Sequence, residues 1–298
     1  MGSIPIDHRL DMIKRFTSIS DLGYKDYIKI IKLSFFFERV RVSNFLLNKR
    51  IAIVFDSPST RTRISTEIAL KEMGANVVFL EEKSMQSVNG ERNKETCKVL
   101  SNYFDIIFLR TKSKKKMEDF KKYVKCILVN SLDKKEHPCQ VFNDIFTCYK
   151  KNIYLKKKKI AWIGKKNNMF NSWMKASKIF DFKILTIMPK RDFKKVFSKR
   201  VKLEKSIKNV FKKSDVINTD TWLSIGEKKK KKYKKLKVRK KMFRFSKKKA
   251  VFLHCLPAYI GKEVDSKTIY SKRSLVFEQS LNKICTTKAI IYYLVGCA

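Results

Sequence analysis

Short apolar runs, each followed by polar or turn residues, recur along the chain and predict its secondary structure. Because the runs lack the alternation of a strand with one solvated face, they indicate strands buried on both faces, in a parallel α/β fold. A helix is predicted over 59–73, where Ile64, Ile68 and Met73 form an apolar stripe. The expected strands are 51–55, 76–80, 105–109, 126–129, 160–163, 183–188, 215–218 and 251–253.

The length of 298 residues exceeds one usual core and predicts about two domains. A Lys-rich stretch at 151–159 divides the expected strands into two groups and is taken as the boundary. We therefore expect domains at 1–150 and 151–270, each a parallel sheet flanked by helices. A C-terminal helix within 271–298 is expected to pack back on the first domain.

The composition is strongly basic. There are 70 Lys and Arg against 27 Asp and Glu, a formal net charge of +43, while 44% hydrophobic residues with 22 Phe exclude a disordered chain. The charge indicates either a polyanionic partner or drift of the surface toward Lys. The tract 228–249 holds 13 Lys and 2 Arg. Its default interpretation is a solvated loop, and its alternative is a nucleic-acid surface where Tyr233, Phe243 and Phe245 stack bases.

The cysteine pattern favours reduced thiols. Seven Cys without a Cys-x-x-Cys pair, and only three His, predict neither a disulfide framework nor a metal site, and we expect no cofactor. No apolar run approaches the roughly 20 residues of a membrane span. The first residues lack the order of a secretion signal. A soluble, cytoplasmic protein without a membrane partner is therefore expected.

Polar residues follow six of the eight expected strands. Ligands of parallel sheets bind beyond the carboxyl ends of the strands, so these residues are site candidates. Ser59, Thr60 and Arg61 begin the predicted helix, a pattern typical of a phosphate site. Taken singly, such residues have structural interpretations, a helix cap for a Ser or a buried core residue for a His or Cys, but their convergence favours a site. The other strand-end segments are 110–111, 137–140, 167–168, 220–224 and 254–257.

Four strings carry a resemblance to a known family. FDSPSTRTR at 55–63, HPCQ at 137–140, DTWLSIG at 220–226 and HCLPA at 254–258 resemble, in order and spacing, motifs of the ornithine carbamoyltransferases. The first two strings are shared with aspartate carbamoyltransferases and specify carbamoyl phosphate only, whereas the last two favour ornithine. The resemblance implies an active site in the cleft between two domains. It also implies formation of L-citrulline and phosphate from carbamoyl phosphate and L-ornithine, in arginine biosynthesis.

The resemblance implies roles for individual residues. The implied catalytic residues are Cys255, Arg61, Arg110 and His137, with Cys255 accepting the amine proton. The implied contacts of carbamoyl phosphate are Ser59, Thr60, Arg61, Thr62, Gln86, Arg110, His137, Gln140 and Lys283. The implied contacts of ornithine are Asn168, Asp220, Ser224, Ile225, Cys255 and Leu256. In this family Gln86 would reach into a neighbour's site, which implies a homotrimer with shared active sites.

Two positions depart from the family pattern, and other functions stay open. Ile225 replaces a Met, and Lys283 replaces an Arg with its two-pronged hydrogen-bonding group, so slower turnover or weaker binding is expected.

One alternative function is a carbamoyltransferase for another amine such as putrescine, although Asp220 with Asn168 favours an amino acid. The other is a basic nucleic-acid-binding protein on a degenerate scaffold. For the enzyme itself, nucleic acid is expected only as a nonspecific partner.

Overall fold

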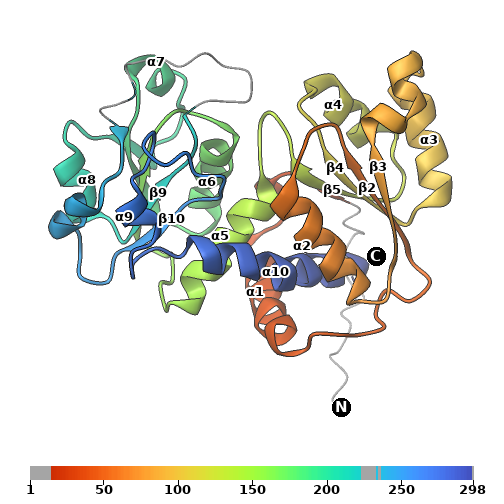
Figure 1. The fold of residues 1–298 in the computed structure, drawn as a ribbon, viewed down its shortest axis with the longest axis horizontal. Helices are drawn as coiled ribbons and strands as arrows, with labels where there is room; N and C mark the ends of the chain where they lie inside the picture. Colours follow the sequence, from red (N-terminus) through yellow and green to blue (C-terminus); the bar gives the residue numbers. More distant parts are fainter. Residues whose placement is uncertain (1–14, 223–232, 234–235, 297–298) are drawn as a thin grey trace. The chain divides into compact units, whose positions relative to one another are not determined.

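The structure, a computed structural model, describes residues 15–222, 233 and 236–296. Contacts divide the chain into two units: unit 1 is Met1–Phe142 with Asn282–Ala298, and unit 2 is Asn143–Leu281. Each unit contains a five-stranded parallel sheet with helices beside it (Figure 1). The predicted α/β class with two parallel sheets is confirmed.

The strands of unit 1 lie in the order β1-β5-β4-β2-β3, and every neighbouring pair is parallel. β2 is buried from Ile51 to Phe55, because it is central and covered on both faces. β3, at the edge of the sheet, is only partly buried. The bounds are β1 Arg15–Phe16, β2 Arg50–Phe55, β3 Asn76–Glu81, β4 Ile106–Arg110 and β5 Ile127–Leu132.

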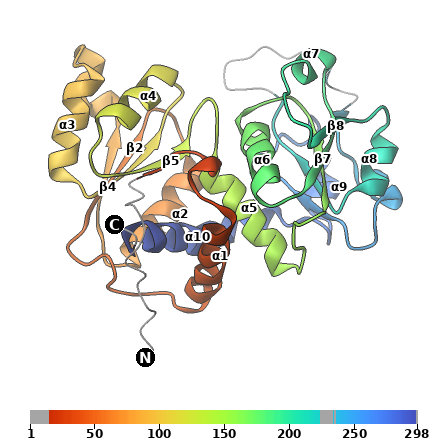
Figure 2. The same ribbon diagram turned by 180° about the vertical axis from the view of Figure 1, so that it is seen from behind.

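Helices cover both faces of the sheet in unit 1 (Figures 1 and 2). On one face, Leu100 of α3 and Phe120 of α4 join the strand residues Val54 and Leu109 in an apolar cluster. On the other face lie α1, α2 and the part of α10 that belongs to unit 1. The bounds are η1 Ile19–Asp21, α1 Tyr24–Arg39, α2 Thr60–Lys71, η2 Glu82–Ser84, η3 Gln86–Asn89, α3 Asn93–Tyr103, α4 Lys114–Tyr123, α5 Pro138–Lys150 and α10 Val276–Gly296.

Two of the three residues of the predicted apolar stripe, Ile64 and Ile68 of α2, lie on a solvent-exposed face of the helix. Ile64 is 51% exposed and Ile68 is 37% exposed, whereas Met73 is fully buried just past the helix end. The chain leaves the helix at Gly74, whose φ of 86° is in the left-handed region that glycine adopts readily. The helix predicted over 59–73 is therefore present, but two residues of its stripe are open to solvent in the single chain.

Unit 2 repeats the parallel architecture in the order β10-β9-β6-β7-β8. Phe170 of α6 packs against Trp162 of β6, while Phe211 of α8 and Phe243 of η5 belong to a separate apolar cluster. The bounds are β6 Lys159–Ile163, α6 Asn168–Ile179, β7 Lys183–Ile187, α7 Lys190–Phe193, β8 Val201–Leu203, α8 Ile207–Lys213, β9 Val216–Thr219, η5 Lys240–Phe245, β10 Val251–Leu253 and α9 Ser266–Ile269.

All eight predicted strands are found, and two more were missed. β1 and β8 contain two and three residues, too few to stand out as apolar runs. Both lie at sheet edges, where only one neighbouring strand stabilises them. In the described parts of the chain, no helix combines the length and apolarity needed to cross a membrane.

The part of the tract 228–249 that the structure describes combines buried aromatic side chains with exposed basic ones, among them Lys240, Lys241 and 247–249. Tyr233 is 4% exposed and Phe243 is 7% exposed, both within the core of unit 2. Phe245 is partly buried. Lys208 Nζ lies 5.1 Å from the centre of its ring, and the Arg244 guanidinium lies 4.6 Å from the same centre. The prediction that Tyr233 and Phe243 stack bases is therefore wrong, because the protein core already holds both rings.

Candidate active site

The first turn of α2 is an anion-binding element of unit 1. The chain leaves β2 at Phe55 and enters α2 with Ser59 as the N-cap residue, in an extended conformation. The Ser59 side chain makes no capping hydrogen bond, which leaves first-turn N–H groups for a ligand. Such groups, with the helix dipole, attract phosphate. Thr60, Arg61 and Thr62 are all in this turn, as the sequence predicts.

The end of β4 is tied to the end of β2 beside this turn. Arg110 is the last residue of β4, and its Nε lies 3.4 Å from Ser57 Oγ. Asp56 Oδ2 accepts hydrogen bonds from Thr111 Oγ1 at 2.5 Å and from Lys112 N at 2.9 Å. These bonds hold the segment after β4 against the segment after β2, so that Arg110 is fixed near α2.

Three buried side chains extend this half of the site. His137, Gln140 and Lys283 are 5%, 1% and 8% exposed. Lys283 Nζ donates to Thr62 Oγ1 at 3.2 Å, which joins α10 to the first turn of α2. Burial lowers the pKa of His137 well below its ordinary value, and the charges of Lys283 and Arg110 lower this pKa further. The imidazole is therefore neutral at about pH 7 and can donate one N–H without adding charge.

A cavity of about 630 Å³ in unit 1 is lined by Ser59, Thr60 and Arg63. The Arg63 guanidinium lies 3.7 Å from the centre of the Phe79 ring, and its Nη1 lies 3.8 Å from Glu81 Oε1. Arg63 is thus engaged by side chains of β3. Arg61, the other guanidinium of the string, has no ion pair within the described chain and is the one left for an anion.

Gln86 lies on an exposed segment between β3 and α3, where its Oε1 accepts a hydrogen bond from Asn89 Nδ2 at 3.0 Å. The start of this segment is anchored by Lys116, which is 4% exposed and whose Nζ lies 2.7 Å from Glu82 Oε1. Met85 packs against the apolar cluster of α3 and α4. Gln86 is therefore presented at the surface of unit 1 by a segment with a fixed base.

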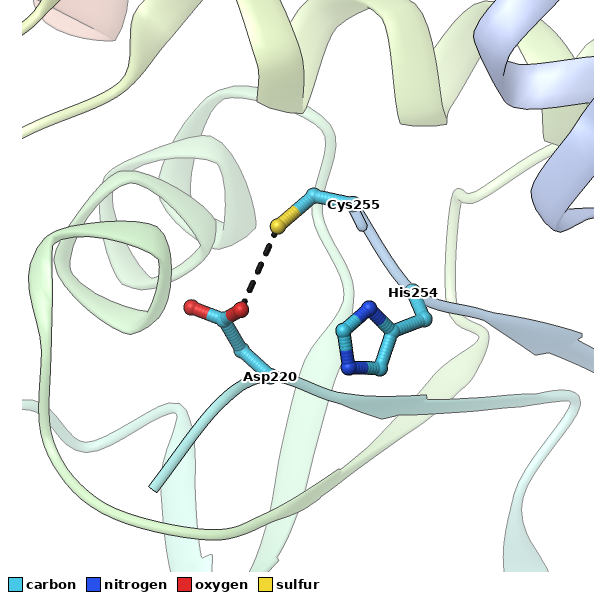
Figure 3. Close-up of side chains that lie close together, drawn as sticks. All are labelled: Asp220, His254 and Cys255. Carbon is cyan, nitrogen blue, oxygen red and sulfur yellow. Dashed lines mark hydrogen bonds between the residues drawn. The ribbon is translucent and has the colours of Figure 1, made fainter. Parts of the chain in front are cut away.

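In unit 2 two of the predicted ornithine residues meet, namely Cys255 and Asp220, which follows β9 (Figure 3). Cys255 Sγ donates to Asp220 Oδ1 at 3.2 Å, and Thr221 N donates to the same oxygen at 2.7 Å. Asn167 Nδ2 donates to Asp220 Oδ2 at 2.6 Å. Asp220 is 9% exposed and has no Lys or Arg ion partner among the described residues. A buried carboxylate supported only by neutral donors favours a ligand with an ammonium group.

Asp220, His254 and Cys255 bring three potential metal-ligand atoms within 4.8 Å of one another. His254 Nδ1, however, accepts the backbone N–H of Leu256 at 2.9 Å, and Nε2 lies 3.3 Å from Glu263 Oε1. Nδ1 therefore uses its lone pair within the protein, and in the matching neutral tautomer Nε2 carries the ring proton, so neither nitrogen offers a lone pair to a metal. Asp220 and Cys255 remain, fewer than the three or four protein ligands of zinc sites, so this donor set does not suit zinc.

The other predicted ornithine residues lie next to this cluster in the chain. Asn168 is the first residue of α6, and Leu256 follows Cys255 with a φ of 53°. Ser224 and Ile225 lie outside the described residues. Within unit 1 the structure joins Thr62 to Lys283, and within unit 2 it joins Asp220 to Cys255.

Two residues that support the site belong to the candidate segments 55–63 and 167–168, but the sequence assigned neither of them a role of its own. Ser57 contacts Arg110, and nothing in its sequence context distinguishes it from an ordinary turn serine. Asn167 holds Asp220 and is also the N-cap of α6, its Oδ1 accepting Phe170 N at 3.0 Å. A signal for Asn167 existed, because it stands between a strand and a helix start, where an Asn side chain commonly caps.

Two family models match the chain. The carbamoyl-P binding domain of aspartate/ornithine carbamoyltransferase matches residues 14–150, and the Asp/Orn binding domain of the same family matches residues 156–294.

Relatives and solved structures agree with this match. The ornithine carbamoyltransferase of Ruthia magnifica subsp. Calyptogena magnifica is 33% identical over 96% of this chain and 100% of that protein. That of Methanococcus vannielii is 34% identical over 92% and 96%. The crystal structure of the Burkholderia thailandensis enzyme aligns with a TM-score of 0.87 at 28% identity, over 96% of this chain and 100% of that one. The chain belongs to the aspartate/ornithine carbamoyltransferase family.

Proposed function

We propose that this chain is an ornithine carbamoyltransferase, which transfers the carbamoyl group of carbamoyl phosphate to the δ-amine of L-ornithine and releases L-citrulline and phosphate. The observation that carries the choice of acceptor is Asp220, a buried carboxylate without a cationic partner in the described chain and in contact with Cys255. An amino acid supplies the missing ammonium group. The domain assignment proposed with it is carbamoyl phosphate for 1–150, ornithine for 151–270, and support of the first domain by 271–298.

The carbamoyl phosphate half-site would act through preset positive charge. The first turn of α2, with Arg61, takes the phosphate dianion, while Arg110 and the neutral His137 donate to the carbonyl oxygen. Attack by the amine places a negative charge on that oxygen in the tetrahedral adduct, and donors already in position stabilise it where it develops. The C–O bond to phosphate then breaks, and phosphate departs with the electron pair, stabilised by Arg61.

The ornithine half-site would orient the amine and take its proton. Asp220 and Asn168 hold the α-amino acid end, so that the δ-amine is presented to the carbonyl carbon. An alkyl amine has a pKa near 10.4 and must lose a proton before it attacks. Cys255, whose Sγ lies 3.2 Å from Asp220 Oδ1, is the proposed proton acceptor. It would act as the thiolate, its own proton having left to solvent before it takes the proton of the amine.

A homotrimer with shared active sites is part of the proposal. Ile64 and Ile68 of α2 are 51% and 37% exposed, an apolar strip of the helix surface that a second copy would cover. The exposed Gln86, on its anchored segment, is the residue proposed to enter a neighbouring copy's carbamoyl phosphate site. The six described cysteines are free thiols, which supports a cytoplasmic location. The proposed role in arginine biosynthesis follows from the proposed product, L-citrulline.

The test is a citrulline assay on the purified protein with carbamoyl phosphate and L-ornithine, repeated with putrescine as a competing amine. Citrulline and phosphate are expected in equal amounts, with a higher kcat/KM for ornithine than for putrescine. Absence of citrulline would overturn the proposed enzyme. Preference for putrescine would retain the carbamoyl transfer and overturn the acceptor.

A further inference from the structure

We infer that Asn167 is a positioning residue for ornithine: its amide holds the Asp220 carboxylate in the orientation that receives the α-ammonium group. The inference rests on the proposed function and assigns a role to a residue that touches Asp220 rather than the reacting atoms. The inference is based on two hydrogen bonds, one at each polar atom of the Asn167 side chain. Asn167 Oδ1 accepts Phe170 N at 3.0 Å, and Asn167 Nδ2 donates to Asp220 Oδ2 at 2.6 Å.

The two bonds make Asn167 a rigid link between α6 and Asp220. The bond to Phe170 fixes the amide plane at the helix start, so Nδ2 has one direction in which to donate. Asp220 cannot rotate freely either, since Thr221 N and Cys255 Sγ both bond to its other oxygen. The carboxylate is therefore held at both oxygens, and Oδ2 keeps an acceptor site for the ligand.

The charge of the donor matters as much as its geometry. A Lys or Arg in place of Asn167 would neutralise Asp220 and compete with the substrate ammonium group. The neutral amide instead orients the carboxylate and leaves its charge for the ligand. Asn167 also precedes Asn168, so the same link fixes the helix turn that carries a second proposed ornithine contact.

Two substitutions separate this role from simple support of α6. Asn167→Ser keeps a capping oxygen but is too short to reach Asp220. Asn167→Asp keeps the size and the cap, and places a carboxyl oxygen 2.6 Å from Asp220 Oδ2 if the geometry is retained. Two carboxylates that close cannot both ionise readily, so the pair retains a proton above the ordinary carboxyl pKa of about 4.

The Asn167→Asp variant should therefore show a new pH dependence. While the pair keeps its proton, the carboxyl group donates to Asp220 as the amide does. When the proton is lost, the two carboxylates repel and Asp220 leaves its position. The titratable groups facing the pair are Cys255 and His254, and Lys165 on the preceding loop has its Nζ 5.8 Å from the Tyr233 ring centre. These groups are common to wild type and variant, so the ratio of the two profiles reports the new pair.

The experiment measures KM for ornithine, KM for carbamoyl phosphate and the inhibition constant of L-norvaline, which keeps the α-amino acid end and lacks the δ-amine. Asn167→Ser is expected to raise the ornithine KM and the norvaline inhibition constant roughly 10- to 100-fold, the range for a lost hydrogen bond to a charged group. For Asn167→Asp, the increase relative to wild type is expected to grow between about pH 6 and about pH 9. The KM for carbamoyl phosphate should change less than about twofold.

Ser113→Ala is the matched control, because Ser113 caps α4 by accepting Lys116 N at 3.1 Å and has no place in the site. It should lower thermal stability as the cap is lost, without changing either KM. The inference is overturned if Asn167→Ser leaves the ornithine KM within threefold of wild type, or if both substrates' KM values rise together. A wild-type protein that forms no citrulline overturns the proposed function itself, so the two failures are distinguishable.

Discussion

The two proposed half-sites differ in the sign of the charge that they present to a ligand. Unit 1 gathers cations and donors, Arg61, Arg110 and Lys283, around a helix N-terminus. Unit 2 gathers a single carboxylate, Asp220, supported only by neutral donors. In a chain with a net charge of +43, the cationic half-site could be mistaken for general basicity, but a buried carboxylate at a strand end could not. The electrostatic potential at each half-site is therefore determined by the groups nearest to it, since exposed charges farther than about 8 to 10 Å are largely screened in physiological salt.

The largest expected effect is the loss of the phosphate guanidinium. Arg61→Ala should lower kcat/KM roughly 1,000-fold, because the departing phosphate loses a charge-assisted partner. Arg63→Ala is the matched control, since that guanidinium already faces Phe79 and Glu81. Steady-state kinetics with both substrates check the pair. Equal losses of kcat/KM in the two variants would show that the phosphate is stabilised by the total positive charge of unit 1 and not by a specific contact with Arg61.

The support of the cationic half-site also depends on charge. Lys288 of α10 is 1% exposed, and its Nζ bonds to Glu72 at the end of α2 and to Arg41 O. Although burial acts to raise the pKa of Glu72, hydrogen bonds from Lys288 and Arg41 lower it overall.

Lys288→Met should reduce the free energy of unfolding by about 3 kcal/mol, the low end for breaking a buried pair, because Glu72 retains Arg41. Lys71→Met, which removes an exposed pair with Glu67, should cost less than about 0.5 kcal/mol in the same chemical denaturation measurement. If both variants unfold at the same denaturant concentration, the buried lysine contributes no special support to α2.

The third prediction addresses the acidic half-site. Asp220→Asn keeps the shape and removes the charge, so the ornithine KM should rise about 100-fold while the KM for carbamoyl phosphate stays near wild type. Asp181→Asn, which alters a surface pair with Arg200, is the control. An equal rise in both KM values would contradict the assignment of the two substrates to separate groups of residues.

Much of the fold followed from the sequence because one physical pattern dominated it. Strands such as β2 are buried on both faces, so they stand out as continuous apolar runs. Strand-end residues such as Arg110 and Asp220 could then be found, since parallel strands end at the same edge. The direction of the Ile64 and Ile68 stripe could not, because periodicity defines a face of a helix and not what covers it.

Fine detail within the sites was harder to predict. Asn167 and Asn168 are adjacent amides, and only the hydrogen bonds show that Asn167 holds Asp220. The chain has 70 Lys and Arg residues, and no local sequence signal distinguishes the buried Lys116, Lys283 and Lys288 from the exposed lysines. Their burial depends on acidic or hydroxyl partners that are distant in sequence, such as Glu82, Thr62 and Glu72.

The smallest expected effect concerns the charge balance around His137. Lys283→Met removes one of the two cations that lower the pKa of His137, so that pKa should rise toward its ordinary value of about 6.5 while burial keeps it below. The KM for carbamoyl phosphate should rise about tenfold, as for one lost charged hydrogen bond. Titration of the His137 ring protons by NMR checks the pKa. Lys135→Met, which removes an exposed pair with Glu118, is the control and should leave this pKa unchanged.

The same shift has a defined sign in stability. Below about pH 6.5 the unfolded chain protonates His137 and the folded chain does not, so the free energy of unfolding falls as pH falls. The loss is at most about 1.4 kcal/mol per pH unit for one group. Because Lys283→Met raises the folded pKa, the acid loss should end at a higher pH than in wild type. If the free energy of unfolding below about pH 6.5 falls identically in wild type, Lys283→Met and Lys135→Met, then Lys283 does not lower the pKa of His137, and burial alone keeps the imidazole neutral.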